Sequence, residues 1–72
     1  MSHNIDMFAE RLKEMRLEKG LTQQQLADVL KVDRTTVLKW ETDGREPSFA
    51  MLVQIARFFE VSCDYLLGNT DY

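Results

Sequence analysis

The stretch of sequence that decides the fold is residues 21–42, which read LTQQQLADVLKVDRTTVLKWET. Its apolar residues recur at spacings of three and four, and this period indicates helices rather than strands. Thr22 and Gln25 form a capping box, which is a start signal for a helix. Asp33 is a suitable N-cap for a second helix, because a carboxylate there accepts backbone hydrogen bonds and favours the positive end of the helix dipole. The stretch therefore predicts two short helices, over 22–30 and 34–42.

Only Lys31, Val32 and Asp33 connect these two helices. So short a connection cannot bring the second helix back antiparallel to the first, so the pair is expected to cross steeply, as in a helix-turn-helix. Ala27 is small where the two helices would meet, and Val32 and Val37 can fill the gap between them. We expect a positive φ at Lys31, because a three-residue turn with Val32 inserted needs a left-handed residue.

Three further helices are predicted around this pair. A helix over 6–19 is expected to bury one apolar face, made of Ile5, Phe8, Leu12 and Met15. Ser48 caps a fourth helix, with an expected inward face of Phe49, Leu52, Ile55, Ala56 and Phe59. Ser62 caps a short fifth helix over 63–67, which ends at Gly68. The predicted fold class is all-α, a compact five-helix domain with a central helix-turn-helix.

The length of 72 residues allows one domain with a small core. We expect residues 1–5 to be a flexible N-terminal tail, residues 6–69 to be the helix-turn-helix domain, and residues 70–72 to be a C-terminal tail. No apolar run approaches the roughly 20 residues that span a bilayer, so no membrane partner is expected. Because Cys63 is the single cysteine, no disulfide is expected and the predicted location is the cytoplasm.

The sequence gives little support for catalysis or metal binding. One histidine, His3, and one distant cysteine make a zinc site or a Cys/His nucleophile a poor interpretation, and no cofactor is expected. Four acids lie close together in sequence: Asp33, Glu41, Asp43 and Glu46. One is a cap, one lies on the inner face of its helix and two lie in a loop, so they do not make an acid/base pair. The chain is not predicted to be an enzyme.

An ordered set of motifs carries a family resemblance over about residues 8–69. The set comprises Leu21-Thr22-Gln23, Leu26-Ala27, Val32, Val37, Trp40-Glu41, Pro47-Ser48 and Val61-Ser62 with Asp64-Tyr65-Leu66-Leu67-Gly68. In this order the motifs resemble the phage repressor/Cro-like helix-turn-helix family of transcriptional regulators (the xenobiotic response element family). The resemblance implies a five-helix, lambda-repressor-like fold that binds double-stranded DNA. It also implies a homodimer on a palindromic operator and, most commonly, repression.

The resemblance also implies which side chains touch DNA in the major groove. Arg34, Thr35 and Lys39 fall on the outward face of the third helix, where the family reads base edges. The helical period places Leu38 on the same face, where it can meet a thymine methyl group. We therefore expect this face to carry sequence recognition.

Other residues match positions of the family outside that face. Gln23 starts the second helix, where the family holds a DNA phosphate with a glutamine, and Arg45 lies in the loop that touches the DNA backbone. Arg16 and Glu41 match a pair that the family buries as a salt bridge between the first and third helices. Both also lie on the inner faces of their predicted helices, and buried charges are rare unless they are paired.

Three features depart from this pattern. Lys31 stands where the family prefers glycine, the glycine of the loop after the third helix is shifted to Gly44, and Glu46 stands where relatives often have a base. The net charge of −3 also opposes DNA binding, unless Arg34, Lys39 and Arg45 form a local positive field.

A protein-interaction module, such as the antitoxin of a toxin–antitoxin pair, therefore stays open as an alternative. Five apolar residues outside the predicted core would mark a dimer or partner surface if they converged: Leu17, Val29, Met51, Phe58 and Tyr65. No small-molecule effector is evident from the sequence.

Overall fold

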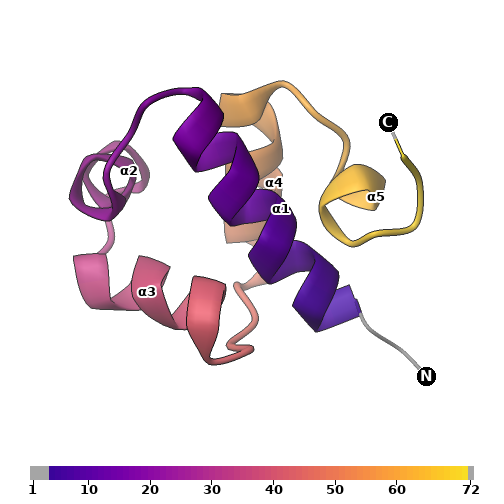
Figure 1. Cartoon of the computed structure of the whole chain (residues 1–72), viewed down its shortest axis with the longest axis horizontal. Helices are drawn as coiled ribbons and strands as arrows, with labels where there is room; N and C mark the ends of the chain where they lie inside the picture. The colour runs from indigo at the N-terminus through magenta and orange to yellow at the C-terminus, as the bar shows by residue number, and fades with distance from the viewer. Residues whose placement is uncertain (1–3, 72) are drawn as a thin grey trace.

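Five helices enclose one core in the computed structural model, which describes residues 4–71 and their side chains from Met7 onward. The helices are α1 (Asn4–Glu18), α2 (Gln23–Leu30), α3 (Arg34–Thr42), α4 (Phe49–Phe59) and α5 (Cys63–Leu66). No strand occurs within residues 4–71. Figure 1 shows α1 crossing the front of the molecule, with α2 and α3 on one side of it, α4 behind it and α5 on the other side. The all-α, five-helix prediction is confirmed.

Every helix contributes to the centre of this core. The largest fully buried side chains come one from each helix: Leu12, Leu26, Val37, Ile55 and Leu66. Helices as short as α2, α3 and α5 are marginal on their own in water. They therefore depend on packing into this shared core for most of their stability.

The helix ends follow the local signals in most places. Thr22 accepts a hydrogen bond from the backbone of Gln25, and the Gln25 side chain accepts one from the backbone of Thr22, so the predicted capping box is present. The side chains of Ser48 and Ser62 cap α4 and α5 as predicted. Asp33 is the N-cap of α3, but its side chain makes no capping bond, so that part of the prediction is wrong. Its carboxylate is exposed, and water can hydrate it without help from the helix.

Lys31 has φ 61° and ψ 43°, so the predicted left-handed residue between α2 and α3 is confirmed. Glu60, which follows α4, takes the same conformation with φ 60° and ψ 44°. This second left-handed residue was not predicted from the sequence. In both turns the backbone N–H of the left-handed residue bonds back to the helix, which satisfies carbonyl groups at the helix end.

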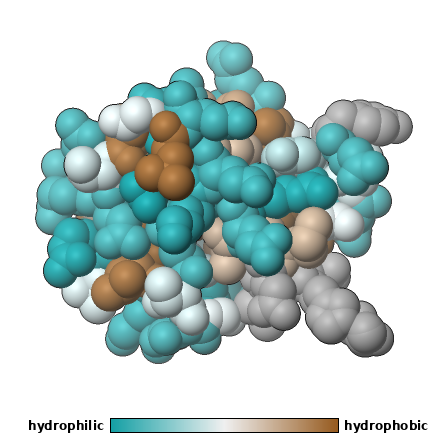
Figure 2. Space-filling model, in the orientation of Figure 1, coloured by the Kyte–Doolittle hydropathy of each residue, from teal (hydrophilic) through white to brown (hydrophobic). Residues whose placement is uncertain are grey.

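The apolar surface differs from expectation at Phe49. This residue was expected to face inward but is 79% exposed, because the first turn of α4 carries it past the core that Leu52 and Ile55 reach. Met51, Phe58 and Tyr65 pack against the core, whereas Leu17 and Val29 are exposed. Figure 2 shows the apolar side chains on one face as separate brown patches within a hydrophilic surface.

The first and last helices differ slightly from their predicted bounds. Residues 1–3, which include His3, lie outside the described part of the chain, as do residue 72 and the side chain of Ile5. Helix α1 begins at Asn4, two residues before the predicted start, and α5 ends at Leu66, one residue before its predicted end.

The segment after α5 is held against α1 by Arg11. The Arg11 guanidinium donates to the carbonyl oxygens of Tyr65 at 2.8 Å and Thr70 at 2.7 Å, and it lies 4.1 Å from the centre of the Tyr65 ring. An ion pair with Asp71 at 3.6 Å adds to this contact. Among residues 4–71, no helix has the length and apolar character to cross a membrane.

Candidate nucleic-acid interface

Helix α3 has one buried face and one exposed face. Val37 is 0% exposed and Trp40 is 4% exposed, and both belong to the core. The side chains of Arg34 and Thr35 are exposed, Leu38 is 36% exposed and Lys39 is half-buried. The structure therefore brings four of the sequence-predicted contact residues onto one side of α3, as the 3.6-residue period requires.

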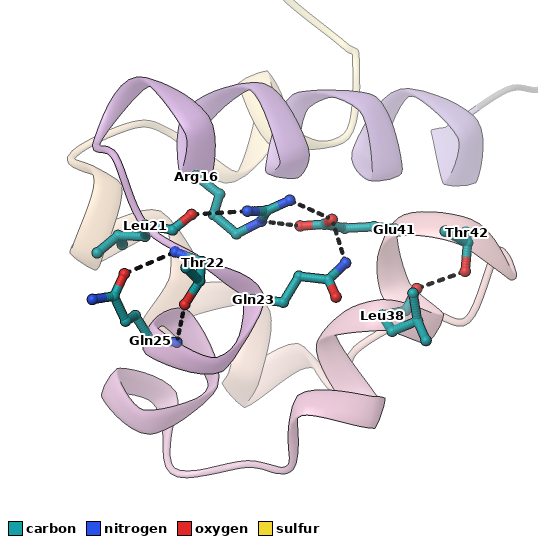
Figure 3. Close-up of polar contacts among 8 residues, drawn as sticks. All are labelled: Arg16, Leu21, Thr22, Gln23, Gln25, Leu38, Glu41 and Thr42. Carbon is teal, nitrogen blue, oxygen red and sulfur yellow. Dashed lines mark hydrogen bonds and ion pairs between the residues drawn. The ribbon is translucent and has the colours of Figure 1, made fainter.

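An ion pair fixes α3 against α1. Arg16 Nε donates to Glu41 Oε2 at 2.8 Å, and Arg16 Nη2 donates to Glu41 Oε1 at 3.1 Å (Figure 3). The two side chains are 8% and 1% exposed, so the contact is nearly dry. Such a two-point contact between a guanidinium and a carboxylate sets direction as well as distance.

Arg16 also holds the turn that leads into α2. Its Nη1 donates to the carbonyl oxygen of Leu21 at 2.8 Å (Figure 3), and the backbone N–H of Leu21 donates to the carbonyl of Arg16 at 3.0 Å. One guanidinium thus links α1, the start of α2 and α3. This linkage orients the two helices of the helix-turn-helix relative to the rest of the domain.

Gln23 lies at the first position of α2, and its side chain reaches the ion pair. Its Nε2 donates to Glu41 Oε1 at 3.1 Å, so the residue is half-buried instead of fully solvated (Figure 3). An amide nitrogen carries two N–H groups, so a second donor remains. This bond was not predicted from the sequence. The partners are 18 residues apart on different helices, and no local pattern predicts such a contact.

The loop between α3 and α4 carries Arg45, whose side chain is exposed. Gly44 takes φ 69°, which turns the chain immediately before Arg45. At the end of α3, the Thr42 hydroxyl donates to the carbonyl oxygen of Leu38 at 2.7 Å (Figure 3). The Thr42 hydroxyl is therefore engaged within its own helix.

The cations of this region are available for a partner. Among the side chains that the structure describes, none forms an ion pair or hydrogen bond with the side chains of Arg34, Lys39 or Arg45. By contrast, Arg11 and Arg16 are engaged inside the domain. Groups of three or more residues suited to hold a metal ion are absent from the described part of the chain.

Known proteins are similar to this chain in sequence. The family model described as helix-turn-helix matches residues 12–66. The HTH-type transcriptional regulator YqaE of Bacillus subtilis is 44% identical over 61 residues, which are 85% of this chain and 53% of YqaE. The HTH-type transcriptional activator BcrR of Enterococcus faecalis is 42% identical over 64 residues, 89% of this chain and 31% of BcrR. The chain thus spans about half the length of the first relative and a third of the second.

Two solved structures are also similar. The restriction-modification controller protein C.AhdI of Aeromonas hydrophila has a TM-score of 0.75 at 31% identity, over 86% of this chain and 94% of that one. A point mutant of C.Esp1396I, bound to its highest affinity operator site, has a TM-score of 0.77 at 30% identity, over 96% of this chain and 91% of that one.

Proposed function

This chain belongs to the helix-turn-helix family of transcriptional regulators, and from that premise we propose that it binds double-stranded DNA in a sequence-specific manner and regulates transcription. The family consists of DNA-binding regulators, not enzymes. The observation that carries the proposal is the exposed face of α3, where Arg34, Thr35 and Leu38 project from a helix whose opposite face is locked in the core.

The first turn of a recognition helix enters the major groove foremost, which assigns the deepest contacts to Arg34 and Thr35. An arginine can donate two hydrogen bonds to a guanine edge, and a leucine can pack on a thymine methyl group. We assign base reading to Arg34, Thr35 and Leu38, with Lys39 reaching a neighbouring edge or phosphate.

Phosphate contacts flank the recognition helix on both sides. Gln23 stands at the N-terminus of α2, where free backbone N–H groups and the helix dipole favour an anion. Arg45 supplies a charge from the loop after α3. These contacts set the position of the protein on the duplex, whereas contacts to base edges set its sequence preference.

We propose that the functional unit is a homodimer in the cytoplasm. Two copies place their α3 helices about 34 Å apart on half-sites one helical turn apart, which matches a palindromic operator. Repression is the proposed outcome, because occupancy of a promoter is enough to block transcription. The relatives include an activator, BcrR, and a phage repressor, RstR of Vibrio cholerae, so both activation and repression occur among them.

The test is selection of bound sites from a pool of random duplexes, followed by binding to the selected duplex and to a scrambled one across a range of salt concentrations. We expect a two-fold symmetric site bound at least about a thousandfold more tightly than the scrambled duplex. If no duplex is preferred at low salt, the DNA proposal fails.

If the DNA proposal fails, the alternative is a protein-interaction module. Its support is the net charge of −3 and the exposed side chains of Leu17, Val29 and Phe49.

A further inference from the structure

Gln23 connects the proposed DNA surface to the interior of the domain. It begins α2, and it donates its side-chain Nε2 to Glu41 Oε1 at 3.1 Å. The Glu41 side chain is 1% exposed, so the acceptor is a buried carboxylate rather than a surface one. The neighbouring Gln24 offers a contrast on the same helix, because its Nε2 donates to Asp28 at 2.9 Å in an exposed contact.

The Glu41 carboxylate is a rigid acceptor. It receives Arg16 Nε on one oxygen, and Arg16 Nη2 together with Gln23 Nε2 on the other (Figure 3). Arg16 is in turn fixed by Leu21, so the carboxylate cannot move without disturbing both α1 and the start of α2. The Gln23 amide is therefore tied to a point whose position is set by the core.

We propose that Glu41 is a positioning residue for DNA binding, which orients the Gln23 amide so that its second N–H points to a phosphate of the DNA backbone. This inference rests on the proposed function. It adds a role for a buried residue that itself touches no DNA.

Two physical effects support the assignment. A glutamine side chain loses much rotational freedom when it is ordered, and a bond that orders it before DNA arrives removes part of that cost from binding. Arg16 neutralises the carboxylate that holds the amide, so Glu41 can lie behind a phosphate contact without repelling the phosphate.

The experiment uses the full chain and the selected operator, with single phosphates replaced in turn by neutral methylphosphonates. The wild type should lose roughly tenfold in affinity when the phosphate bound by Gln23 is neutralised. In Gln23→Ala this penalty should vanish. Glu41→Asp keeps the negative charge beside Arg16 but withdraws the carboxylate by one methylene from both Arg16 and Gln23, so its fold is checked by circular dichroism before binding is measured. The penalty at that single phosphate should therefore shrink to less than about twofold, while base preference and the penalties at other phosphates persist.

The double variant Gln23→Ala/Glu41→Asp should bind no more weakly than Gln23→Ala. The positioning role is overturned if Glu41→Asp retains the full penalty at that phosphate, or if it weakens all phosphates equally. If no phosphate depends on Gln23, the inference falls while DNA binding stands. If the wild type prefers no duplex, the proposed function and the inference fall together.

A second measurement needs neither DNA nor a folded Glu41 variant. Side-chain amide NMR of the wild type should show Gln23 ordered and slow to exchange, with Gln24 as the matched mobile control. Equal mobility of the two amides would rule out positioning by Glu41.

Discussion

Arg16 and Glu41 are 25 residues apart in the chain, yet their side chains share two hydrogen bonds, of 2.8 and 3.1 Å, between α1 and α3. The same carboxylate also accepts from Gln23, and the same guanidinium donates to Leu21. This small network joins the first three helices of the domain. Each buried polar side-chain atom among the described residues has at least one hydrogen-bond partner.

Replacement of Glu41 by alanine should destabilise the domain sharply. The change leaves the Arg16 guanidinium buried without its counter-charge, which costs about 3–5 kcal/mol. This is a large fraction of the stability of so small a domain, so a large fall in melting temperature or complete unfolding is expected by circular dichroism. Glu46→Ala is the matched control, because Glu46 is exposed in a loop and its loss should change little. An unchanged melting temperature for Glu41→Ala would show that the pair contributes no stability.

Replacement of Lys31 by glycine should leave stability unchanged or raise it by up to about 1 kcal/mol. The residue has φ 61°, which strains a side chain, although the greater chain entropy of glycine in the unfolded state offsets part of the gain. Glu60→Gly is a matched comparison, because Glu60 has φ 60°. Urea denaturation measures both. A clear loss of stability in Lys31→Gly would mean that the lysine side chain stabilises the turn.

Gly20 and Gly68 allow two reasons for a glycine to be compared: a positive φ, and a lack of room for a side chain. Both have positive φ, of 81° and 72°. A Cβ at Gly20 would meet nothing within 4 Å, whereas one at Gly68 would lie 2.8 Å from Cβ and Cγ of Met7. Gly20→Ala should therefore cost about 1–2 kcal/mol from backbone strain, and Gly68→Ala should cost more, because the chain at residue 68 must also move away from Met7 of α1. Denaturant midpoints compare the two variants, and equal losses would show that Met7 yields without cost.

Arg34 and Arg45 should affect DNA binding in different ways. Arg34→Ala should cost about 1–3 kcal/mol on the selected site and relax one base position in each half-site, because it removes a contact to a base edge. Arg45→Ala should weaken all sequences alike and reduce the salt dependence, because it removes a phosphate contact. Binding of both variants to selected and scrambled duplexes gives the measurement. Equal weakening on both duplexes by Arg34→Ala would assign this residue to a phosphate instead.

Local features of this protein could be read from its sequence, because each depends on a few neighbouring residues. The Thr22–Gln25 capping box, the left-handed Lys31 and the span of α3 (Arg34–Thr42) are all present in the structure. The helical period also placed Val37 inward and Leu38 outward on α3, since side-chain direction along a helix follows from spacing alone.

Tertiary packing decided the features that the spacing of residues along the chain cannot predict. Phe49 has the spacing of a core residue, but whether another element covers the first turn of α4 depends on the whole fold, and it is left exposed. Arg11 reaches the carbonyl oxygens of Tyr65 and Thr70, 54 and 59 residues away, and Gln23 bonds to Glu41 across two helices. The sequence by itself thus determined the helices, three of their side-chain caps and most of their inner faces, through interactions within a few turns of chain. Only the tertiary structure decided which polar side chains meet between helices, because those contacts depend on how the helices pack.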